Sequence, residues 1–399
     1  MINKIIPYGK QHITGEDVKE VVDALLSSHI TQGPKITEFE ENFAKYVGSK
    51  FAVAVSNGTA ALHLAVLALG LKEGDKVITT PITFAASANC VRFCGADIVF
   101  ADIDRETYLI DIHSVRKILE SSPKGTFKGI IPVDFAGRVV NLEAYKKLAD
   151  EFDLWIIEDA CHAPGGYFTD SSGNTQHAGN GKFADMSVFS FHPVKHIACG
   201  EGGMITTDDY ELYKQLNRLR SHGITKGDDE YTNSELFANG GDNEAVGFPG
   251  WYMEMQYLGY NYRLTDIQAA LGNSQLKRAD EGLKKRKAIA KNYDTFFSNK
   301  NYVLGQSKFI EGHAYHLYVL EVTDRLGLYN YLREKNIFAQ IHYIPCHLMP
   351  YYRNLGWKEG DMPNAENYYK SCISIPVYPT LSFEDQEFVK ETINGYYER

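Results

Sequence analysis

Short apolar runs alternate with amphipathic stretches between about residue 50 and residue 207. The runs are rich in valine, isoleucine and phenylalanine and predict β-strands, whereas the stretches between them repeat apolar residues at helical spacing. The predicted strands are Phe51–Val55, Lys76–Thr80, Asp97–Asp102, Gly129–Asp134, Leu154–Glu158, Asp185–Phe191 and Gly203–Thr207, and the helices between them include Thr59–Leu69, Phe84–Cys94, Ile112–Glu120 and Leu142–Glu151. This alternation is typical of a mostly parallel sheet covered by helices, so we expect an α/β fold.

The pattern changes in the second half of the chain. Residues 225–255 hold several glycines among acidic and aromatic residues and predict a long excursion from the fold. Thr265 then opens a long helical pattern. The last predicted elements are strands at His316–Val322 and Phe338–Tyr343 and a helix at Leu326–Lys335. We therefore expect a large α/β domain with its N-terminal segment over residues 1–255, and a linking helix with a smaller α+β domain over residues 256–399.

Composition narrows the classes of partner. The chain has 399 residues, 44% of them hydrophobic, and its 51 acidic and 41 basic residues give a net charge of -10. No basic run indicates nucleic acid or an anionic membrane, and no window approaches the roughly 20 apolar residues of a membrane span. The N-terminus lacks the pattern of a secretory signal, and the six cysteines form no metal-binding spacing. We expect a cytoplasmic protein without a metal site, whose partners are small molecules and copies of itself.

An acid and a lysine follow two of the predicted strands. Asp159 comes directly after Leu154–Glu158, and Lys195 follows Asp185–Phe191 in a turn that contains Pro193. Ligands of open parallel sheets bind at the carboxyl ends of the strands, so both side chains could face one ligand. Each has an ordinary structural explanation when taken alone, because acids at strand ends are commonly turn residues and single lysines are commonly solvated.

A third element is the turn Ser56-Asn57-Gly58-Thr59 between a predicted strand and a predicted helix. Small residues at a helix start leave backbone N–H groups open to a phosphate, although these residues could also be a plain N-cap. Together, a lysine, an acid and a phosphate turn are what pyridoxal phosphate needs: an amine for a Schiff base, a partner for the pyridine nitrogen and an anchor. Phe84 could stack on the ring, or pack in the core.

Five motifs spread over nearly the whole chain carry a resemblance to a known family. They are Thr31-Gln32-Gly33-Pro34, Asn57-Gly58-Thr59-Ala60-Ala61-Leu62, Glu158-Asp159-Ala160-Cys161-His162, Ser190 to Lys195 with Gly200-Glu201-Gly202-Gly203, and Gly259-Tyr260-Asn261-Tyr262-Arg263-Leu264. On these motifs the chain resembles the DegT/DnrJ/EryC1/StrS family of sugar aminotransferases. The resemblance implies the fold type I, aspartate aminotransferase-like, architecture of pyridoxal-phosphate-dependent transferases.

The resemblance also implies roles for single residues. Lys195 would be the Schiff-base lysine and proton shuttle, and Asp159 would pair with the ring nitrogen. Cofactor contacts are further implied at Asn57, Gly58, Thr59, Phe84, His162, Ser190 and Asn261, the last from the partner chain of a homodimer with shared active sites. Sugar or nucleotide contacts are expected at Tyr8, Thr31, Gln32, His316 and His347, each with a structural explanation of equal weight.

Four segments are similar to transaminases of pseudaminic-acid synthesis, namely Thr31–Gly33, Thr80–Phe84, Ser221–Lys226 and Gln340–Pro345. This likeness implies L-glutamate as amino donor and a UDP-linked 4-keto-6-deoxy-N-acetyl sugar as acceptor. Amination of another 4-keto or 3-keto sugar on UDP, dTDP or GDP stays open, as does a non-catalytic sensor that binds the cofactor. A nicotinamide-dependent oxidoreductase is disfavoured, because the turn at residues 56–59 lacks G-x-G-x-x-G. Dehydratases of the family carry histidine in place of the lysine, whereas this chain keeps Lys195.

Overall fold

The computed structural model describes residues 4–226, 231–242, 244 and 246–399. Within them, seven strands form a central sheet in the order β2-β10-β9-β6-β5-β3-β4. The strands are β2 (Phe51–Val55), β3 (Lys76–Thr79), β4 (Asp97–Phe100), β5 (Gly129–Ile131), β6 (Trp155–Asp159), β9 (Met186–Ser190) and β10 (Gly203–Thr207). All neighbouring pairs are parallel except those of β10, which runs antiparallel to both β2 and β9. The predicted α/β fold with a mostly parallel sheet is confirmed.

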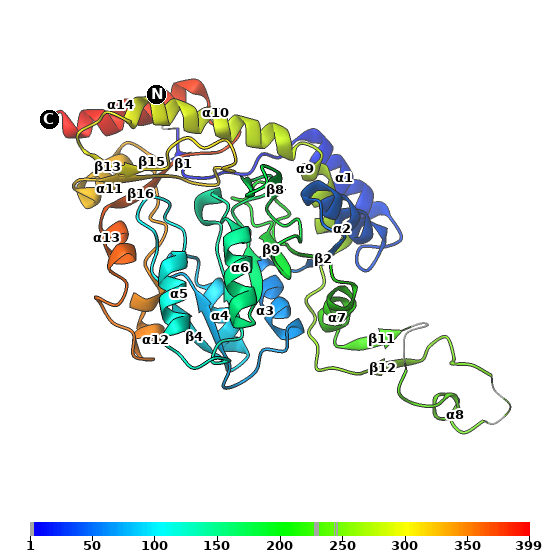
Figure 1. The fold of residues 1–399 in the computed structure, drawn as a ribbon. Coiled ribbons are helices and arrows are strands. Elements are labelled where there is room, and N and C mark those ends of the chain that lie inside the picture. The colour runs from blue at the N-terminus through cyan, green and yellow to red at the C-terminus, as the bar shows by residue number, and fades with distance from the viewer. Residues whose placement is uncertain (1–3, 227–230, 243, 245) are drawn as a thin grey trace.

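Helices cover both faces of this sheet (Figure 1). They are α2 (Pro34–Val47), α3 (Gly58–Ala68), α4 (Ala86–Phe93), α5 (Ile112–Glu120), α6 (Leu142–Phe152), α7 (Tyr210–Arg220) and α9 (Asp266–Leu276). Successive side chains of a strand point to opposite faces. In β2, Val53 and Val55 accordingly join the core that contains α3, whereas Ala52 and Ala54 join the core that contains α2. The apolar runs were continuous in the sequence because both faces of the strands are buried.

The C-terminal part has a second, antiparallel sheet, and α10 and α14 lie along one side of it (Figure 1). Its order is β13-β14-β16. The elements are α10 (Ala279–Phe297), β13 (Val303–Gln306), β14 (Tyr318–Val322), α11 (Arg325–Glu334), α12 (Pro350–Arg353), α13 (Pro363–Ser371), β16 (Cys372–Ile375) and α14 (Phe383–Tyr397). The short β1 (Ile6–Pro7) pairs in parallel with β15 (Ile337–Phe338) and so attaches the first described residues to this part. The domain boundary between residues 255 and 256 stays a prediction.

Two predicted elements of this half were wrong in extent. The long helix predicted from Thr265 is two helices, because the backbone of Arg278 is not helical. The guanidinium of Arg278 binds the buried Asp17. The predicted strand Phe338–Tyr343 is a regular strand only at its start. Gln340 then forms an isolated bridge with Ser374, and residues 340–344 line a cavity described below. Both departures come from tertiary contacts, which a periodic pattern does not contain.

A narrow arm extends away from the body of the molecule (Figure 1). It consists of β11 (Ile224–Lys226) paired with β12 (Met253–Met255), and it carries the short helix α8 (Glu235–Ala238). The carboxylate of Glu254 accepts hydrogen bonds from the backbone N–H groups of Thr232 and Asn233. The excursion predicted at residues 225–255 corresponds to this arm, although its residues 227–230, 243 and 245 lie outside the described residues.

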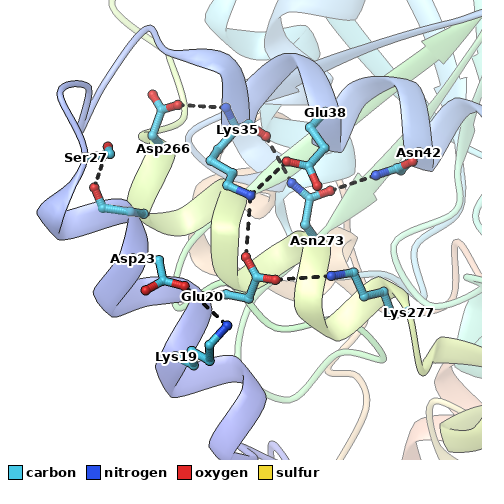
Figure 2. A network of polar contacts seen from close by, with 11 residues as sticks. Lys19, Glu20, Asp23, Ser27, Lys35, Glu38, Asn42, Asp266, Asn273 and Lys277 are labelled. Atoms are coloured by element: carbon cyan, nitrogen blue, oxygen red, sulfur yellow. Dashed lines mark hydrogen bonds and ion pairs between the residues drawn. The ribbon is translucent and has the colours of Figure 1, made fainter.

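Ion pairs hold the N-terminal helix α1 (Gly15–Leu26) against α2 and α9 (Figure 2). Lys35 contacts Glu20 at 3.4 Å and Glu38 at 2.9 Å, and Lys277, the C-cap residue of α9, contacts Glu20 at 3.2 Å. The carboxylate of Asp266 accepts from the backbone N–H groups of Gly33 and Lys35, so it anchors the start of α2 to the start of α9. The segment that precedes α2 is thereby fixed near the body.

Candidate active site

A cavity of about 990 Å³ lies at the carboxyl ends of β6 and β9. The position agrees with the general rule for ligands of open α/β sheets. Ten of the residues predicted as cofactor or substrate contacts line it together: Tyr8, Asn57, Gly58, Thr59, Phe84, Asp159, His162, Ser190, Lys195 and His316. They come from separate parts of the chain, so the fold assembles the group that the sequence only suggested.

The carboxylate of Asp159 is buried at the end of β6 and is held from two sides. Ser87 donates to Oδ2 at 2.6 Å, and the backbone N–H of Cys161 donates to Oδ1 at 3.2 Å. Since the single hydroxyl proton of Ser87 goes to Asp159, Thr83 is the donor in its 2.7 Å contact with Ser87. Two hydroxyls in series therefore fix the carboxylate. Neither hydroxyl was predicted from the sequence: Ser87 belongs to no motif, and the segment Thr80–Phe84 was noted without a role for Thr83.

Ser87→Ala is expected to lower kcat by about tenfold, which corresponds to about 1.4 kcal/mol for one hydrogen bond to a charged group. The carboxyl group of Asp159 would lose the hydrogen bond that fixes its direction. The test is to measure kcat and cofactor affinity for this variant and for Thr83→Ala. In Thr83→Ala, Ser87 still donates to Asp159, so kcat is expected to fall only about twofold. Equal and negligible effects of the two variants would show that the hydroxyls do not orient the carboxylate.

Lys195 lies in the turn that follows β9, where its backbone N–H donates to the carbonyl of His192 at 2.8 Å. Burial lowers the pKa of the Lys195 amine, while the nearby thiol of Cys161 and the carboxylate of Asp159 act in the opposite direction. A lower pKa makes the neutral, nucleophilic amine available closer to neutral pH. The lysine and Asp159 line the same cavity.

The turn after β2 has the geometry of an anion cradle. The side chain of Asn57 accepts from Ala60 N at 2.8 Å and caps α3, so the N-cap interpretation is correct for this residue. The first N–H groups of a helix have no partner within the helix and can bind an anion. A Cβ at Gly58 would lie 3.0 Å from Cβ of Ser190, so glycine lets the serine of β9 approach the turn.

Aromatic rings form one wall of the cavity. His162 accepts a hydrogen bond at Nδ1 from Ala136 N at 3.2 Å, which places its proton on Nε2, and Nε2 then donates to the Tyr343 hydroxyl at 3.3 Å. Burial lowers the pKa of His162 well below its usual range, so the ring is neutral. The ring centroid of His316 lies 4.3 Å from that of His162, and Phe84 lies 6.5 Å from Tyr343. Tyr343 was missed in the sequence, where it occurs in a segment without a catalytic motif.

A buried pair of carboxyl groups lies directly behind Asp159. Glu158 accepts from Gly179 N at 2.8 Å and from the Ser187 hydroxyl at 2.6 Å through one oxygen, and Asp134 accepts from Val140 N at 2.8 Å. Burial, with the adjacent Glu158, raises the pKa of Asp134 well above its usual range. We assign the shared proton to Asp134, because the two donors on Glu158 favour its ionised form.

Asp134→Asn is expected to become more stable relative to the wild type as pH rises. Folded wild type keeps a proton on Asp134 that the unfolded chain releases above about pH 4, so its stability falls with pH up to the raised pKa. Asparagine has no such proton, and the difference should grow by up to about 1.4 kcal/mol per pH unit. Urea unfolding at pH 5 and pH 7, at one cofactor concentration, measures it. Parallel pH dependences of the two proteins would mean that Asp134 is ionised.

Four predicted contacts lie outside this cavity within the one subunit. His347 is fully buried and binds Glu366 at 3.0 Å, because the turn at residues 346–348 directs it into the core, so its expected sugar contact is not supported. Thr31 bridges to Thr265, and Gln32 lines a separate groove beneath the arm. Asn261 bridges to Ser221. Its contribution to the site of a partner chain stays a prediction.

The chemistry of the cavity fits pyridoxal phosphate. An amine, a fixed carboxylate and an anion cradle with glycine at its closest approach are present on one surface, and neutral aromatic rings stand beside them. Across the described ranges, no three histidine, cysteine, aspartate or glutamate side chains are grouped as metal ligands. The helices that the structure describes include none with the length and apolar character of a membrane span.

Comparisons with known proteins identify similar chains. The profile of the DegT/DnrJ/EryC1/StrS aminotransferase family matches residues 11–394. The spore coat polysaccharide biosynthesis protein SpsC of Bacillus subtilis is 39% identical over 400 residues, which cover 98% of this chain and 97% of that protein. The UDP-4-amino-4,6-dideoxy-N-acetyl-beta-L-altrosamine transaminase of Campylobacter jejuni is 35% identical, with coverages of 99% and 98%. The structure of Helicobacter pylori PseC, an aminotransferase of pseudaminic-acid biosynthesis, superimposes with a TM-score of 0.86 at 30% identity, over 99% of this chain and 100% of that one.

Proposed function

Because this chain belongs to the DegT/DnrJ/EryC1/StrS aminotransferase family, a family of fold type I sugar transaminases, we propose that it moves the amino group of L-glutamate to the 4-keto carbon of a UDP-linked 4-keto-6-deoxy-N-acetyl sugar. The observation that supports the proposal is that Lys195 and Asp159 line the same cavity, beside the turn that would bind the phosphate. The sugar is proposed from the similar Campylobacter and Helicobacter enzymes, whose names and titles refer to this class of substrate or pathway.

Each residue of the cavity has its own role in the proposed transamination. Pyridoxal phosphate, when bound, supplies the electron sink that stabilises a carbanion next to nitrogen. In each half-reaction Nζ of Lys195 would accept a proton at one carbon and deliver it at another, first from the donor carbon and finally to the acceptor carbon, so it would act as base and then as acid in both. The carboxylate of Asp159 would hold the proton on the ring nitrogen, and Ser87 fixes that carboxylate. Gly58, Thr59 and Ser190 would hold the phosphate.

We also propose that two subunits complete each site. Asn261 does not line the cavity of its own subunit, and the motif that contains it resembles the segment by which the family reaches into a neighbouring chain. A homodimer with shared sites would bring the residue to the cofactor phosphate. Mixing an inactive Lys195→Ala chain with an inactive Asn261→Ala chain should restore part of the activity through the mixed dimer, and no restoration would oppose a shared site.

A different nucleotide-linked keto sugar is the second candidate. The specific reason is the 39% identity to SpsC, a protein of spore coat polysaccharide synthesis, which exceeds the identity to the Campylobacter enzyme. The members of the family share the cofactor site, so this choice depends on the sugar and nucleotide contacts alone.

Turnover against a panel of keto sugars tests the function and separates the candidates. UDP-, dTDP- and GDP-linked 4-keto and 3-keto sugars are each supplied with L-glutamate, and 2-oxoglutarate and the amino sugar are measured. We expect kcat/KM to be greatest for the UDP-linked 4-keto-6-deoxy-N-acetyl sugar. Preference for another sugar would select the second candidate. A protein whose cofactor colour is unchanged by glutamate would be a sensor, and a colourless protein that binds NAD would be an oxidoreductase.

A further inference from the structure

A second cavity, of about 130 Å³, also has Lys195 in its wall. It is formed by the N-terminal segment, the end of α9 and the first turns of α10. Its charged residues are mostly basic: Lys10, Lys195, Arg278, Lys285 and Arg286, with Glu281 as the acid. On a chain with a net charge of -10, such a concentration of cations is unusual and indicates an anion.

Ion pairs neutralise only part of this charge. Arg278 binds the buried Asp17, and Lys285 binds Glu281 at 2.6 Å. In the part of the chain that the structure describes, no carboxylate pairs with Lys10 or Arg286. Apart from Lys195, which also lines the larger cavity, two cations of this cavity are therefore left without a counter-ion.

Of these two cations, Arg286 is the more deeply buried and has the greater need of a counter-ion. Its side chain is 1% exposed, and Nη1 donates to the carbonyls of Tyr315, His316 and Val377. Its Nε is buried and has no hydrogen-bond partner among the described residues. Burial lowers the pKa of Arg286 to about 10, as expected for a guanidinium that no carboxylate balances. Burying an unpaired charge is costly, so a bound anion would stabilise this arrangement.

His196 restricts the class of anion, because it needs a hydrogen-bond donor. Its Nε2 donates to the carbonyl of Ala314 at 2.8 Å, so its Nδ1 is an acceptor, and this atom is buried without a partner. All three residues line the cavity, and each has a buried nitrogen without a partner: the donors Nε of Arg286 and Nε of Arg278, and the acceptor Nδ1 of His196. Sulfate and chloride can only accept hydrogen bonds, whereas hydrogen phosphate both accepts and donates.

We propose that this cavity is a binding site for a small protonated oxyanion, with hydrogen phosphate as the simplest ligand, which serves as the counter-ion of Arg286. A space of about 130 Å³ admits a five-atom ion but not a nucleotide sugar. The site is separate from the phosphate turn after β2, which lines the larger cavity. It does not depend on which sugar the enzyme uses.

Calorimetric titration of the cofactor-loaded protein with inorganic phosphate tests the proposal, because the cofactor then fills the phosphate turn. We expect saturable binding of one phosphate per subunit. Arg286 itself is a poor target, since its replacement would also release three backbone carbonyls. Lys10→Gln and Lys285→Gln lie at the rim and should each raise Kd by about fivefold, whereas Lys284→Gln, an exposed neighbour that does not line the cavity, should leave Kd unchanged.

The alternatives give different results. Absence of saturable binding would overturn the proposal, as would binding that is the same in Lys10→Gln, Lys285→Gln and Lys284→Gln. Phosphate that binds only to the cofactor-free protein occupies the turn after β2, and this also overturns it. Sulfate should bind at least about fivefold more weakly than phosphate, and equal affinities would remove the role given to His196.

Discussion

Lys195→Ala protein is expected to bind pyridoxal phosphate without a covalent bond and to lose transaminase activity by at least about 10⁴-fold. The variant lacks both the amine that attaches the cofactor and the group that moves the proton, and proton transfer by a positioned side chain alone contributes about 10² to 10⁴. Mass spectrometry of the borohydride-treated protein measures the attachment, and single-turnover kinetics with glutamate measures the loss.

Lys72→Ala is the matched control, because Lys72 is exposed and does not line either cavity. It should retain full activity and a covalently bound cofactor. If Lys195→Ala kept more than about one hundredth of the activity, or if the cofactor stayed attached, another amine would have to be the reactive one, and the proposed function would lose its main support.

Asp159→Asn is expected to lower kcat by about 10²-fold or more while the cofactor remains bound. The amide can still accept the hydrogen bond of Ser87, so the geometry at the end of β6 is kept and the negative charge alone is removed. A carboxylate beside a cation commonly shifts a pKa by one to three units, and two units correspond to about 2.7 kcal/mol. The ring nitrogen would therefore lose its proton near neutral pH and withdraw electrons less strongly.

The control for this change lies at the other end of the same strand. Asp153 precedes β6 and has a left-handed backbone conformation that asparagine adopts readily, so Asp153→Asn should be silent. The visible absorption of the cofactor across a pH series reports the protonation, and steady-state kinetics reports kcat. Activity of Asp159→Asn within tenfold of the wild type would show that the carboxylate does not act on the cofactor.

The sequence was most informative where local pattern and general topology agree. Asp159 and Lys195 could be assigned to one site because each follows a buried strand, and parallel strands end at a common edge. The direction of β10 could not be read in the same way. The run Gly203–Thr207 is buried on both faces, and such a run has the same composition in a parallel and in an antiparallel strand.

The site residues that escaped prediction share a different property. Ser87 belongs to no motif, and the segment of Tyr343 carries no chemical signature. The roles of both depend on neighbours far away in the chain. His347 shows the converse, since a histidine near a predicted strand end turned into the core to meet Glu366. Side-chain direction after a strand is set by the packing of the following turn, which single-sequence patterns do not resolve.

The order of strands in the central sheet has a consequence for how the protein is made. β2 is the first strand of that sheet to leave the ribosome, yet its partner in the sheet is β10, which begins at residue 203. Until then, the turn that follows β2 has no neighbouring strand to hold it. Pairing across such a long separation is slow, so cofactor capture should be a late event in biogenesis, and nascent chains released before β10 emerges should not retain the cofactor.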